Sequence, residues 1–414
     1  MKRVIVIGGG PAGLMAASTA ASAGASVLLI EGATRLANKL RLTGGGHANL
    51  SHVGDSTAHL AHITRNPEFA RPALTAMDAA ALCATLAAWG LPTIADEEGR
   101  IFPASRNAHQ VAAVLRSRCL AQGVGFRLAS PVERILVNEG VVTGVQVGPH
   151  QITASAVIVA TGGASYPETG SDGSGLQLAA SLGHPVTALQ PGLVALRAAP
   201  RQVEALQGLA LPAVSVTLVQ QGRPVGTRRG DLLFTQHGLS GPVIHNLSLL
   251  LAPEMRELQA RLRLLASQGL EVEQARRLAA DAGHRPWHSL LVPDMPLRLQ
   301  RHLAARLDVR LGAPWRSLDA LTQTRLLSLV DALPFDVAVA TPLERATVTL
   351  GGVDVAQVEP TTLASRLVQG LYFAGEVLDV TGESGGYNLQ LAFSTGRLAG
   401  QSAAQWLERG AATP

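Results

Sequence analysis

Near its amino terminus the chain reads Val4-Ile5-Val6-Ile7-Gly8-Gly9-Gly10-Pro11-Ala12-Gly13. Four consecutive apolar residues, 4–7, are typical of a parallel strand that is covered on both faces. The pattern Gly-x-Gly-x-x-Gly follows at once, and an apolar helix is predicted over 14–23. A second short strand, 27–30, ends at Glu31. Strand, glycine turn, helix, strand and acid in this order predict the nucleotide-binding half of a Rossmann fold, within an α/β class.

Each residue type in the glycine turn has a role in holding a dinucleotide. Gly8 permits the tight turn, Gly10 lets the backbone approach a pyrophosphate, and Gly13 lets helix and strand pack closely. Pro11 and Ala12 open the helix, whose free N–H groups and dipole attract phosphate. We therefore expect all five residues at the cofactor.

Glu31 is placed to recognise a ribose. A carboxylate at the end of the second strand accepts hydrogen bonds from both hydroxyls of an adenosine ribose, which favours a ribose without a 2′-phosphate. This first region leaves NAD and FAD both open.

The segment Lys39-Leu40-Arg41-Leu42-Thr43-Gly44-Gly45-Gly46-His47-Ala48-Asn49 favours FAD. Three consecutive glycines between hydroxyl and amide side chains suit a backbone that lies against a flat ring and its diphosphate. An NAD site needs no such element at this position. The residues expected to bind the cofactor here are Lys39, Arg41, Thr43, Gly44, Gly45 and Asn49.

The middle of the chain returns to the cofactor. Residues 125–128, 134–137, 141–147 and 156–160 are predicted strands, and the last runs into Ala160-Thr161-Gly162-Gly163. We expect Ala160, Thr161 and Gly162 to contact the cofactor, and the backbone of Val132 to pair with the adenine edge.

The carboxy-terminal part supplies the remaining half of the predicted site. Residues 347–353 form a strand into a double-glycine turn, and 371–376 form a buried strand that ends in Gly-Glu, whose acid can accept from a ribityl hydroxyl. A last helix opens at residues 385–390 and runs to Gly400; its N–H groups can stabilise negative charge on the flavin pyrimidine. The expected cofactor contacts are Gly352, Gly375, Glu376, Gly386, Tyr387, Asn388 and Leu389.

Between these parts the pattern changes. Residues 192–235 alternate apolar and polar in the manner of strands, whereas 255–268, 272–282, 296–307 and 317–329 show helical spacing. We predict an FAD-binding domain over 1–190 and 346–414, a β-rich substrate-side domain over 191–252 and 333–345, and a helical insertion over 253–332.

Composition narrows the function classes. Only 3% of the 414 residues are aromatic, and the arginines never run longer than a pair, which disfavours a nucleic-acid surface. Cys83 and Cys119 form neither a disulfide framework nor a zinc site; both are expected as buried helical residues, as suits a cytoplasmic protein. The charge-free stretch 4–30 is broken by the glycine turn, so no membrane segment is expected there.

Side chains for catalysis are weakly marked. His47, Tyr166, His237 and Tyr387 lie within or beside the motifs above and are candidate acids or bases, although packing roles compete for the two tyrosines. His52, His59 and His62 have irregular spacing and no accompanying acidic or cysteine ligands, so no metal is expected.

Over nearly its whole length the chain resembles the bacterial BaiN-type and aminoacetone-oxidase-type FAD-dependent oxidoreductases. The resemblance is carried by residues 4–13, 39–49, 160–170, 232–242, 351–353 and 370–400. It implies a glutathione-reductase type 2 FAD domain with an inserted β domain and helical subdomain, and no separate NAD(P)H domain. One departure stands out: His47-Ala48 replaces the Arg-Cys that usually follows the triple glycine in these proteins.

Three functions follow as alternatives. The first is reduction of an enone-like small molecule by hydride transfer through flavin N5, with diffusible NAD(P)H as donor. The second is oxidation of a small amine such as aminoacetone by oxygen. The third is a non-catalytic flavin-binding protein. The sequence leaves the substrate and the oligomeric state open.

Overall fold

The computed structural model describes residues 3–252 and 255–409, which fall into two compact units. Unit 1 comprises Met1–Gly192 with Pro342–Pro414, and unit 2 comprises Leu193–Thr341. Each unit packs around a hydrophobic core of its own. Residues 253–254, at the start of the expected helical insertion, and 1–2 and 410–414, at the ends of the expected FAD-binding domain, lie outside the described residues.

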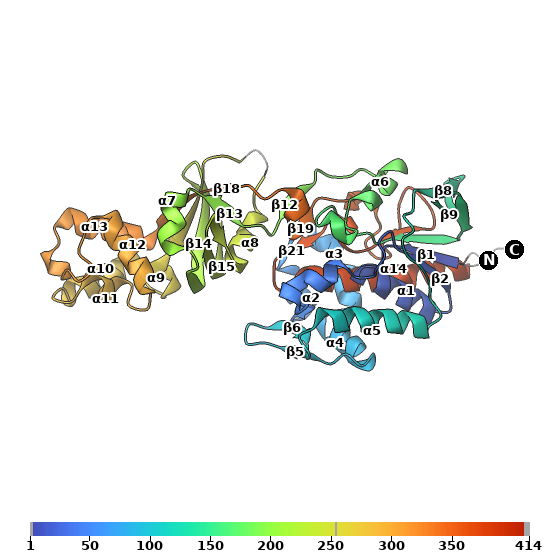
Figure 1. The fold of residues 1–414 in the computed structure, drawn as a ribbon, viewed down its shortest axis with the longest axis horizontal. Coiled ribbons are helices and arrows are strands. Elements are labelled where there is room, and N and C mark those ends of the chain that lie inside the picture. Colours follow the sequence, from blue (N-terminus) through green and yellow to red (C-terminus); the bar gives the residue numbers. More distant parts are fainter. Residues whose placement is uncertain (1–2, 253–254, 410–414) are drawn as a thin grey trace. The chain divides into compact units, whose positions relative to one another are not determined.

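Unit 1 is built on a five-stranded parallel sheet in the order β20-β11-β1-β2-β7. Figure 1 labels two of these strands, β1 and β2. These strands span Leu371–Phe373, Ala156–Val159, Arg3–Ile7, Ser26–Ile30 and Gly125–Arg127. The central strand β1 and its neighbour β11 are buried along their apolar residues, as their unbroken apolar runs predict. The order places β20, from the carboxy-terminal part of the chain, in the same sheet as β1 from the amino-terminal part.

Smaller sheets and helices complete unit 1. The further strands are β3 (Ser51–His52), β4 (Ile63–Arg65), β5 (Thr93–Ala95), β6 (Arg100–Pro103), β8 (Arg134–Asn138), β9 (Val141–Val147), β10 (His150–Thr153), β12 (Gln190–Gly192), β19 (Val348–Leu350) and β21 (Thr381–Gly382). The helices are α1 (Pro11–Ser22), α2 (Ser56–Leu60), α3 (Pro67–Ala76), α4 (Ala79–Ala88), α5 (Ala108–Ala121), α6 (Ser174–Ser181) and α14 (Tyr387–Arg409).

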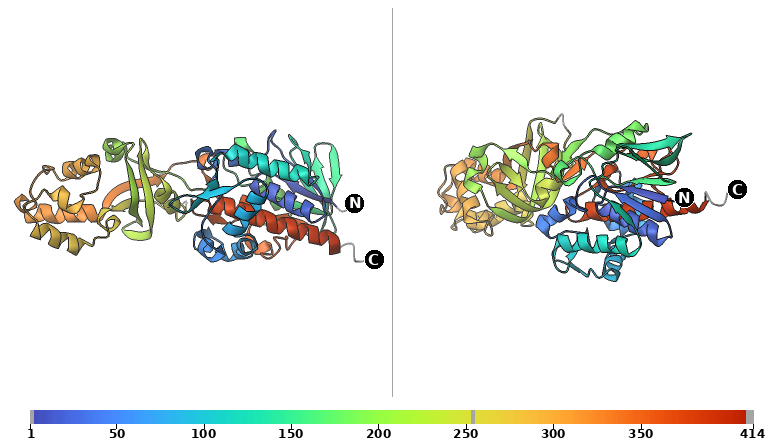
Figure 2. Two further views of the ribbon diagram at one scale, coloured as in Figure 1. Left: turned by 90° about the horizontal axis from the view of Figure 1, so that it is seen from below. Right: turned by 45° about the vertical axis from the view of Figure 1, so that its right-hand side comes forward.

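Helices α1 and α14 pack along each other, so the two ends of the chain share one helix pair (Figures 1 and 2). Glycines on α14 allow this close approach: a Cβ on Gly396 would lie 2.3 Å from the Ala12 carbonyl oxygen, and one on Gly400 would lie 2.5 Å from that of Ala16. Both distances are shorter than any van der Waals contact, so only glycine fits at these positions.

Unit 2 is a closed antiparallel barrel in the order β13-β16-β15-β14-β17-β18. The strands, in sequence order, are β13 (Leu196–Ala198), β14 (Ala210–Gln220), β15 (Arg223–Thr235), β16 (Gly238–Ser240), β17 (Leu258–Arg263) and β18 (Leu333–Val339). The helices of this unit are α7 (Pro200–Val203), α8 (Pro242–Ser248), α9 (Leu264–Ser267), α10 (Val272–Asp281), α11 (Trp287–Leu291), α12 (Leu297–Arg306) and α13 (Ala320–Asp331).

One predicted helix is wrong. Residues 255–268 were expected to be helical, at the start of the insertion over 253–332, but they contain β17 and only the four-residue helix α9. Along β17 the buried residues alternate with half-buried ones, the period of a strand, and both edges pair within the barrel. The other three predicted helices are present as α10, α12 and α13. Their ends lie within two residues of the predicted ones, except that α13 starts three residues later than predicted.

The two cysteines differ in their surroundings. Cys119 is buried on α5, and burial raises the pKa of its thiol to about 12. Cys83 on α4 is only half-buried, so the expectation that both are buried is wrong for this residue.

Candidate functional site

The predicted cofactor residues follow the carboxyl ends of four adjacent parallel strands. Gly8 follows β1, Glu31 follows β2, Ala160 follows β11, and Gly375 comes shortly after β20. Since these strands are parallel neighbours, their carboxyl ends share one edge of the sheet, the usual ligand edge of an open α/β fold. Segments that lie more than 340 residues apart in the sequence therefore meet at one place.

The glycines of the turn divide into two kinds. A Cβ on Gly8 would lie 2.4 Å from the Ala160 carbonyl oxygen, and one on Gly13 would lie 1.9 Å from the Gly8 carbonyl oxygen, so packing within the chain excludes larger residues there. A Cβ on Gly10 would meet no atom within 4 Å. Gly10 caps the start of α1, ahead of Pro11 and Ala12, so its open side lies over the first free N–H groups of that helix.

The Glu31 carboxylate is held by backbone donors. One oxygen accepts from the Gly9 N–H at 2.6 Å, and the other accepts from the Ala33 N–H at 2.8 Å. Burial raises the pKa of Glu31 above its ordinary value, and these bonds offset part of that effect. The Ser130 N–H donates to the Glu31 carbonyl, which brings the segment that contains Val132 close to the acid.

Lys39 joins the amino-terminal half of the site to the carboxy-terminal half. Its ammonium group lies 2.8 Å from the nearer carboxylate oxygen of Glu376 and donates to the Ser165 hydroxyl at 2.7 Å. The same carboxylate accepts from the Thr349 N–H at 2.9 Å. Four separated segments thus converge at one charge pair. The sequence motifs selected both charged residues but did not predict that they pair.

The triple-glycine loop exposes its backbone. Gly44 and Gly45 have φ values of 56° and 64°, the left-handed region that glycine adopts without strain, and both are exposed. The Thr43 hydroxyl donates back to the Leu40 carbonyl at 2.6 Å, which fixes the loop entry. This arrangement leaves an exposed stretch of backbone without side chains.

Several buried polar atoms at this edge lack a partner. Among the described residues, the Arg41 Nε, the Asn49 Oδ1 and the Thr161 Oγ1 are buried without a hydrogen bond, and so is the Ser171 hydroxyl, next to Gly162. A buried polar atom without a partner costs about 1–3 kcal/mol, so these atoms call for a polar ligand. The atoms present therefore fit a dinucleotide with many hydroxyl and phosphate groups.

The start of α14 is shaped by close backbone contact. Gly386 has a φ of 103°, and a Cβ on this residue would lie 2.3 Å from the Ser51 carbonyl oxygen, too close for any side chain. The Asn388 amide both donates to and accepts from the Gly382 backbone, at 2.8 and 2.9 Å. Tyr387 is buried and Leu389 half-buried. Near the same edge, Gly352 donates its N–H to the Thr187 hydroxyl at 3.0 Å.

The four candidate catalytic residues belong to separate segments, three in unit 1 and one in unit 2. His47 is exposed, and its Nδ1 lies 3.0 Å from the Arg106 carbonyl oxygen. Tyr166 is half-buried, and its backbone has a φ of 56°, in the left-handed region. Tyr387 belongs to α14. His237 belongs to unit 2, between β15 and β16, and is exposed.

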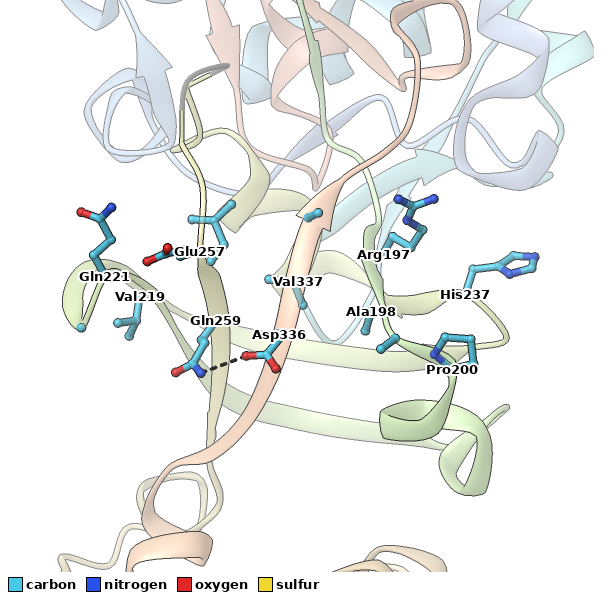
Figure 3. Close-up of a pocket in the computed structure, with 14 residues that line it drawn as sticks. Arg197, Ala198, Pro200, Val219, Gln221, His237, Glu257, Gln259, Asp336 and Val337 are labelled. Carbon is cyan, nitrogen blue, oxygen red and sulfur yellow. Dashed lines mark hydrogen bonds between the residues drawn. The ribbon is translucent and has the colours of Figure 1, made fainter.

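His237 lines a pocket on the barrel of unit 2, about 880 Å³ in volume (Figure 3). Figure 3 shows Arg197 and His237 toward one side, Glu257 toward the other, and a hydrogen bond from Gln259 to Asp336, 2.9 Å long, between them. The pocket is thus lined by charged groups of both signs, the cation Arg197 and the anions Glu257 and Asp336. The sequence motifs did not single out these three residues.

The three histidines that sequence spacing set aside come together around Tyr387. The rings of His52 and His62 stack on the tyrosine ring, and His59 meets it edge-on. Across the described parts of the chain, no three His, Cys, Asp or Glu side chains converge on a point where a metal could bind. Tyr387, the partner that the three histidines share, lies over 320 residues away from them in the sequence, so no local pattern could reveal the cluster.

Within residues 3–252 and 255–409, no helix is both long and apolar enough to cross a membrane.

Comparison with known proteins connects this geometry to a family. The family model of the HI0933-like protein Rossmann domain matches residues 2–402. A ribosomal RNA dihydrouridine synthase of Haemophilus influenzae is 31% identical over 94% of this chain and 96% of its own length. A 3-dehydro-bile acid delta(4,6)-reductase of Clostridium scindens is 31% identical over 98% of this chain and 100% of its own length.

Solved structures show the same fold at low sequence identity. A 3-ketosteroid-delta4-(5alpha)-dehydrogenase from Rhodococcus jostii has a TM-score of 0.52 at 16% identity, with 97% of each chain covered. A 3-ketosteroid delta1-dehydrogenase from Sterolibacterium denitrificans has a TM-score of 0.53 at 14% identity, with 98% of this chain and 100% of the other covered. The expected α/β class with a Rossmann-type FAD-binding domain is confirmed, and a β-barrel accompanies it. This chain belongs to the HI0933-like family of FAD-dependent oxidoreductases.

Proposed function

We propose that this protein reduces a carbon–carbon double bond conjugated to a carbonyl group, with electrons passed from NAD(P)H through flavin N5 to a small organic substrate. Unit 1 is proposed to hold FAD and unit 2 to serve the substrate side. Membership of an oxidoreductase family sets aside the non-catalytic alternative. Bound FAD would supply the redox chemistry, and the chain would supply binding, orientation and electrostatics.

The cofactor proposal rests on one observation: segments from the amino-terminal and carboxy-terminal parts of the sequence meet at one edge of the sheet. Gly10 and the first turn of α1 would receive the pyrophosphate, Glu31 the adenosine ribose, and the Lys39–Glu376 pair the ribityl chain or ring edge. The unpartnered Asn49 and Thr161 atoms would gain partners from the ligand. Each group thus meets a part of FAD whose chemistry it matches.

The reaction class is supported by what two relatives have in common. A delta(4,6)-reductase of a 3-dehydro compound and a dihydrouridine synthase are named for different substrates. In both cases hydrogen is added across a double bond conjugated to a carbonyl: the ring ketone of the first, and the C4 carbonyl of uracil in the second. A hydride at the β-carbon and a proton at the α-carbon account for either reaction.

Charge distribution favours a second candidate substrate, a uracil base within RNA. Unit 2 has 17 arginines against 12 acidic residues, a net charge of +5, whereas unit 1 has 17 basic and 18 acidic residues, a net charge of −1. All of the positive excess of the chain therefore resides in the inserted unit. Such an excess supports contact with phosphates, although the arginines form no long run. This candidate departs from the expectation that nucleic acid plays no part.

Product analysis distinguishes these substrates. The FAD-loaded protein would be incubated without oxygen with NADPH and either 4-androstene-3,17-dione, 2-cyclohexenone or transcribed ribosomal RNA, and each product weighed by mass spectrometry. We expect a gain of two hydrogens in an enone. A gain in RNA alone would establish the second candidate. Turnover of aminoacetone with oxygen, and of none of the others, would instead establish the amine oxidase.

A further inference from the structure

A cluster of aromatic rings lies where β3 meets the start of α14. The ring centroids of His62 and Tyr387 are 4.5 Å apart and those of His52 and Tyr387 are 5.3 Å apart, both in stacked geometry. His59 approaches the tyrosine edge-on at 5.4 Å. Since Gly386 packs on Ser51, directly before His52, the cluster adjoins two elements of the proposed cofactor site.

His62 has a carboxylate partner. Its Nδ1 lies 2.9 Å from the Glu383 Oε2, and the Glu383 N–H donates to the His62 carbonyl at 2.8 Å. The antiparallel pair β4 and β21, directly beside these residues, holds them in this register. A carboxylate accepts hydrogen bonds, so Nδ1 carries a proton in this arrangement, and 43% of the His62 side chain is exposed to solvent.

The three histidines differ in their freedom to move a proton. Both ring nitrogens of His52 face backbone carbonyl oxygens, at 3.0 and 2.9 Å. His59 is 1% exposed, its Nδ1 lies 2.9 Å from the Asp55 carbonyl oxygen, and burial lowers its pKa. The Nε2 of His62 has no hydrogen bond to any described residue, and the side chain is 43% exposed. Only His62 combines an orienting carboxylate with access to water.

Tyr387 provides the surface against which His62 lies. Burial, and next the charge of Glu383, raise the pKa of the tyrosine to about 12, so its hydroxyl stays protonated at neutral pH. The ring therefore fixes the plane of the imidazole without competing for its proton.

We propose that His62 is the proton donor of the double-bond reduction, oriented by Glu383 and held in plane by Tyr387. The inference rests on the proposed function. A hydride, which bound reduced FAD would supply from its N5–H bond, bonds to the β-carbon, and the π electrons move toward the carbonyl as an enolate. The His62 Nε2–H bond then breaks, its proton bonds to the α-carbon, and neutral imidazole remains. A proton from the solvent then restores the Nε2–H bond, so the reaction consumes one solvent proton overall, while Nδ1 keeps its proton on Glu383 throughout.

The groups that face His62 come from every element around it. They are Glu383 after β21, Tyr387 on α14, His52 on β3 and His59 on α2. Since each turnover takes up one solvent proton, the rate of enone reduction should fall as the pH rises.

Rapid mixing separates the two half-reactions. FAD-loaded wild type, His62→Gln, Tyr387→Phe and the exposed control His109→Gln would each be reduced by NADPH and then mixed with 2-cyclohexenone or 4-androstene-3,17-dione in H₂O and D₂O. In His62→Gln we expect unchanged flavin reduction, but reoxidation by the enone at least ~10²-fold slower, independent of pH, and without stereospecific deuterium at the α-carbon. Tyr387→Phe should keep the pH dependence, and His109→Gln should match wild type.

A second readout does not depend on turnover. Nitrogen-15 NMR of the histidines should show the neutral form of His62 as the Nδ1–H tautomer in the wild type, and as a mixture of tautomers in Glu383→Gln.

The outcomes separate the two proposals. If wild type reduces an enone and His62→Gln keeps its rate and pH profile, the donor assignment is wrong and the proposed function stands. Loss of the pH dependence in Tyr387→Phe instead would make the phenol the donor. If no enone reoxidises the reduced wild type, the proposed function fails and this inference fails with it.

Discussion

Single residues at the sheet edge show which glycines serve the fold and which serve the ligand. The motif Gly-x-Gly-x-x-Gly gives all three glycines equal weight, but the space around them does not. Gly8 and Gly13 are enclosed by backbone atoms, whereas Gly10 faces open space. A side chain at Gly10 therefore disturbs whatever binds there and leaves the protein itself intact.

This difference predicts opposite effects of two substitutions. Gly10→Glu should abolish FAD retention, because the carboxylate occupies and repels the pyrophosphate position, while the melting temperature of the FAD-free protein stays near wild type. Gly13→Ala should lower that melting temperature, because its Cβ would lie 1.9 Å from the Gly8 carbonyl oxygen. Absorbance of the purified proteins and thermal unfolding measure both effects. A fully yellow Gly10→Glu protein would contradict the site.

Glu31 should make FAD binding sensitive to acid. The ionised carboxylate accepts from ribose hydroxyls, so affinity is present above its pKa and is lost as the pH falls through it. Since burial raises that pKa above its ordinary value, release begins at milder acidity than for an exposed glutamate. Glu31→Gln should weaken FAD by about 1.5–3 kcal/mol and remove this dependence. Fluorescence titration between neutral and acidic pH tests this, with the exposed Glu133→Gln as the control.

Residue types alone marked much of the proposed site but not the proton donor. Lys39 and Glu376 were both selected from local motifs, and the structure pairs them. His62 was set aside because its partners, Glu383 and Tyr387, follow over 320 residues later. Only the pairing of β4 with β21 brings them together, and a short antiparallel pair of this kind leaves no periodic signal.

At the scale of elements, the helix pair α1 and α14 couples the two ends of the chain. Gly396 and Gly400 lie four residues apart, on one side of α14, and each contacts a carbonyl of α1. The same α1 presents its first turn to the proposed pyrophosphate. Packing between the helices therefore sets the position of that turn.

Adding one methyl group to this interface should disturb both stability and binding. Gly396→Ala places a Cβ 2.3 Å from the Ala12 carbonyl oxygen, and such overpacking costs roughly 1–3 kcal/mol. We expect a lower melting temperature and weaker FAD binding, measured by calorimetry and fluorescence. Gln405→Ala, at an exposed position of the same helix, should change neither. Equal behaviour of the two variants would show that α14 can shift without cost.

Elements were predictable where periodicity and residue type agree. The strands and helix around the glycine turn lie within a few residues of their predicted bounds. Strand β17 was missed because Leu, Gln, Ala and Arg are good helix formers, although they alternate along the strand. Pairing to β14 and β18 in the barrel outweighs that preference.

At the scale of the whole molecule, unit 2 is an insertion with adjacent ends. Strand β13 follows its entry and strand β18 precedes its exit, and Leu196 pairs with Val339. The chain thus enters and leaves unit 2 at neighbouring points, as is usual where one domain interrupts another.

Removal of the insertion should separate cofactor binding from substrate turnover. With residues 193–341 replaced by a short glycine-serine linker, unit 1 keeps its own core and every proposed FAD contact, so it should fold and retain FAD. It should not reduce an enone. Circular dichroism, FAD fluorescence and turnover assays test the three statements. Loss of FAD from a folded protein would place part of the cofactor site in unit 2.

The central claim, that this flavoprotein carries electrons from a nicotinamide to a conjugated double bond, is tested most directly by the colour of its flavin. The FAD-loaded protein would be mixed anaerobically with NADPH or NADH, and then with 4-androstene-3,17-dione or 2-cyclohexenone. We predict bleaching of the visible flavin band by a nicotinamide and full recovery on addition of an enone, without oxygen. A band that neither nicotinamide bleaches, or that recovers only when air is admitted, would contradict the account.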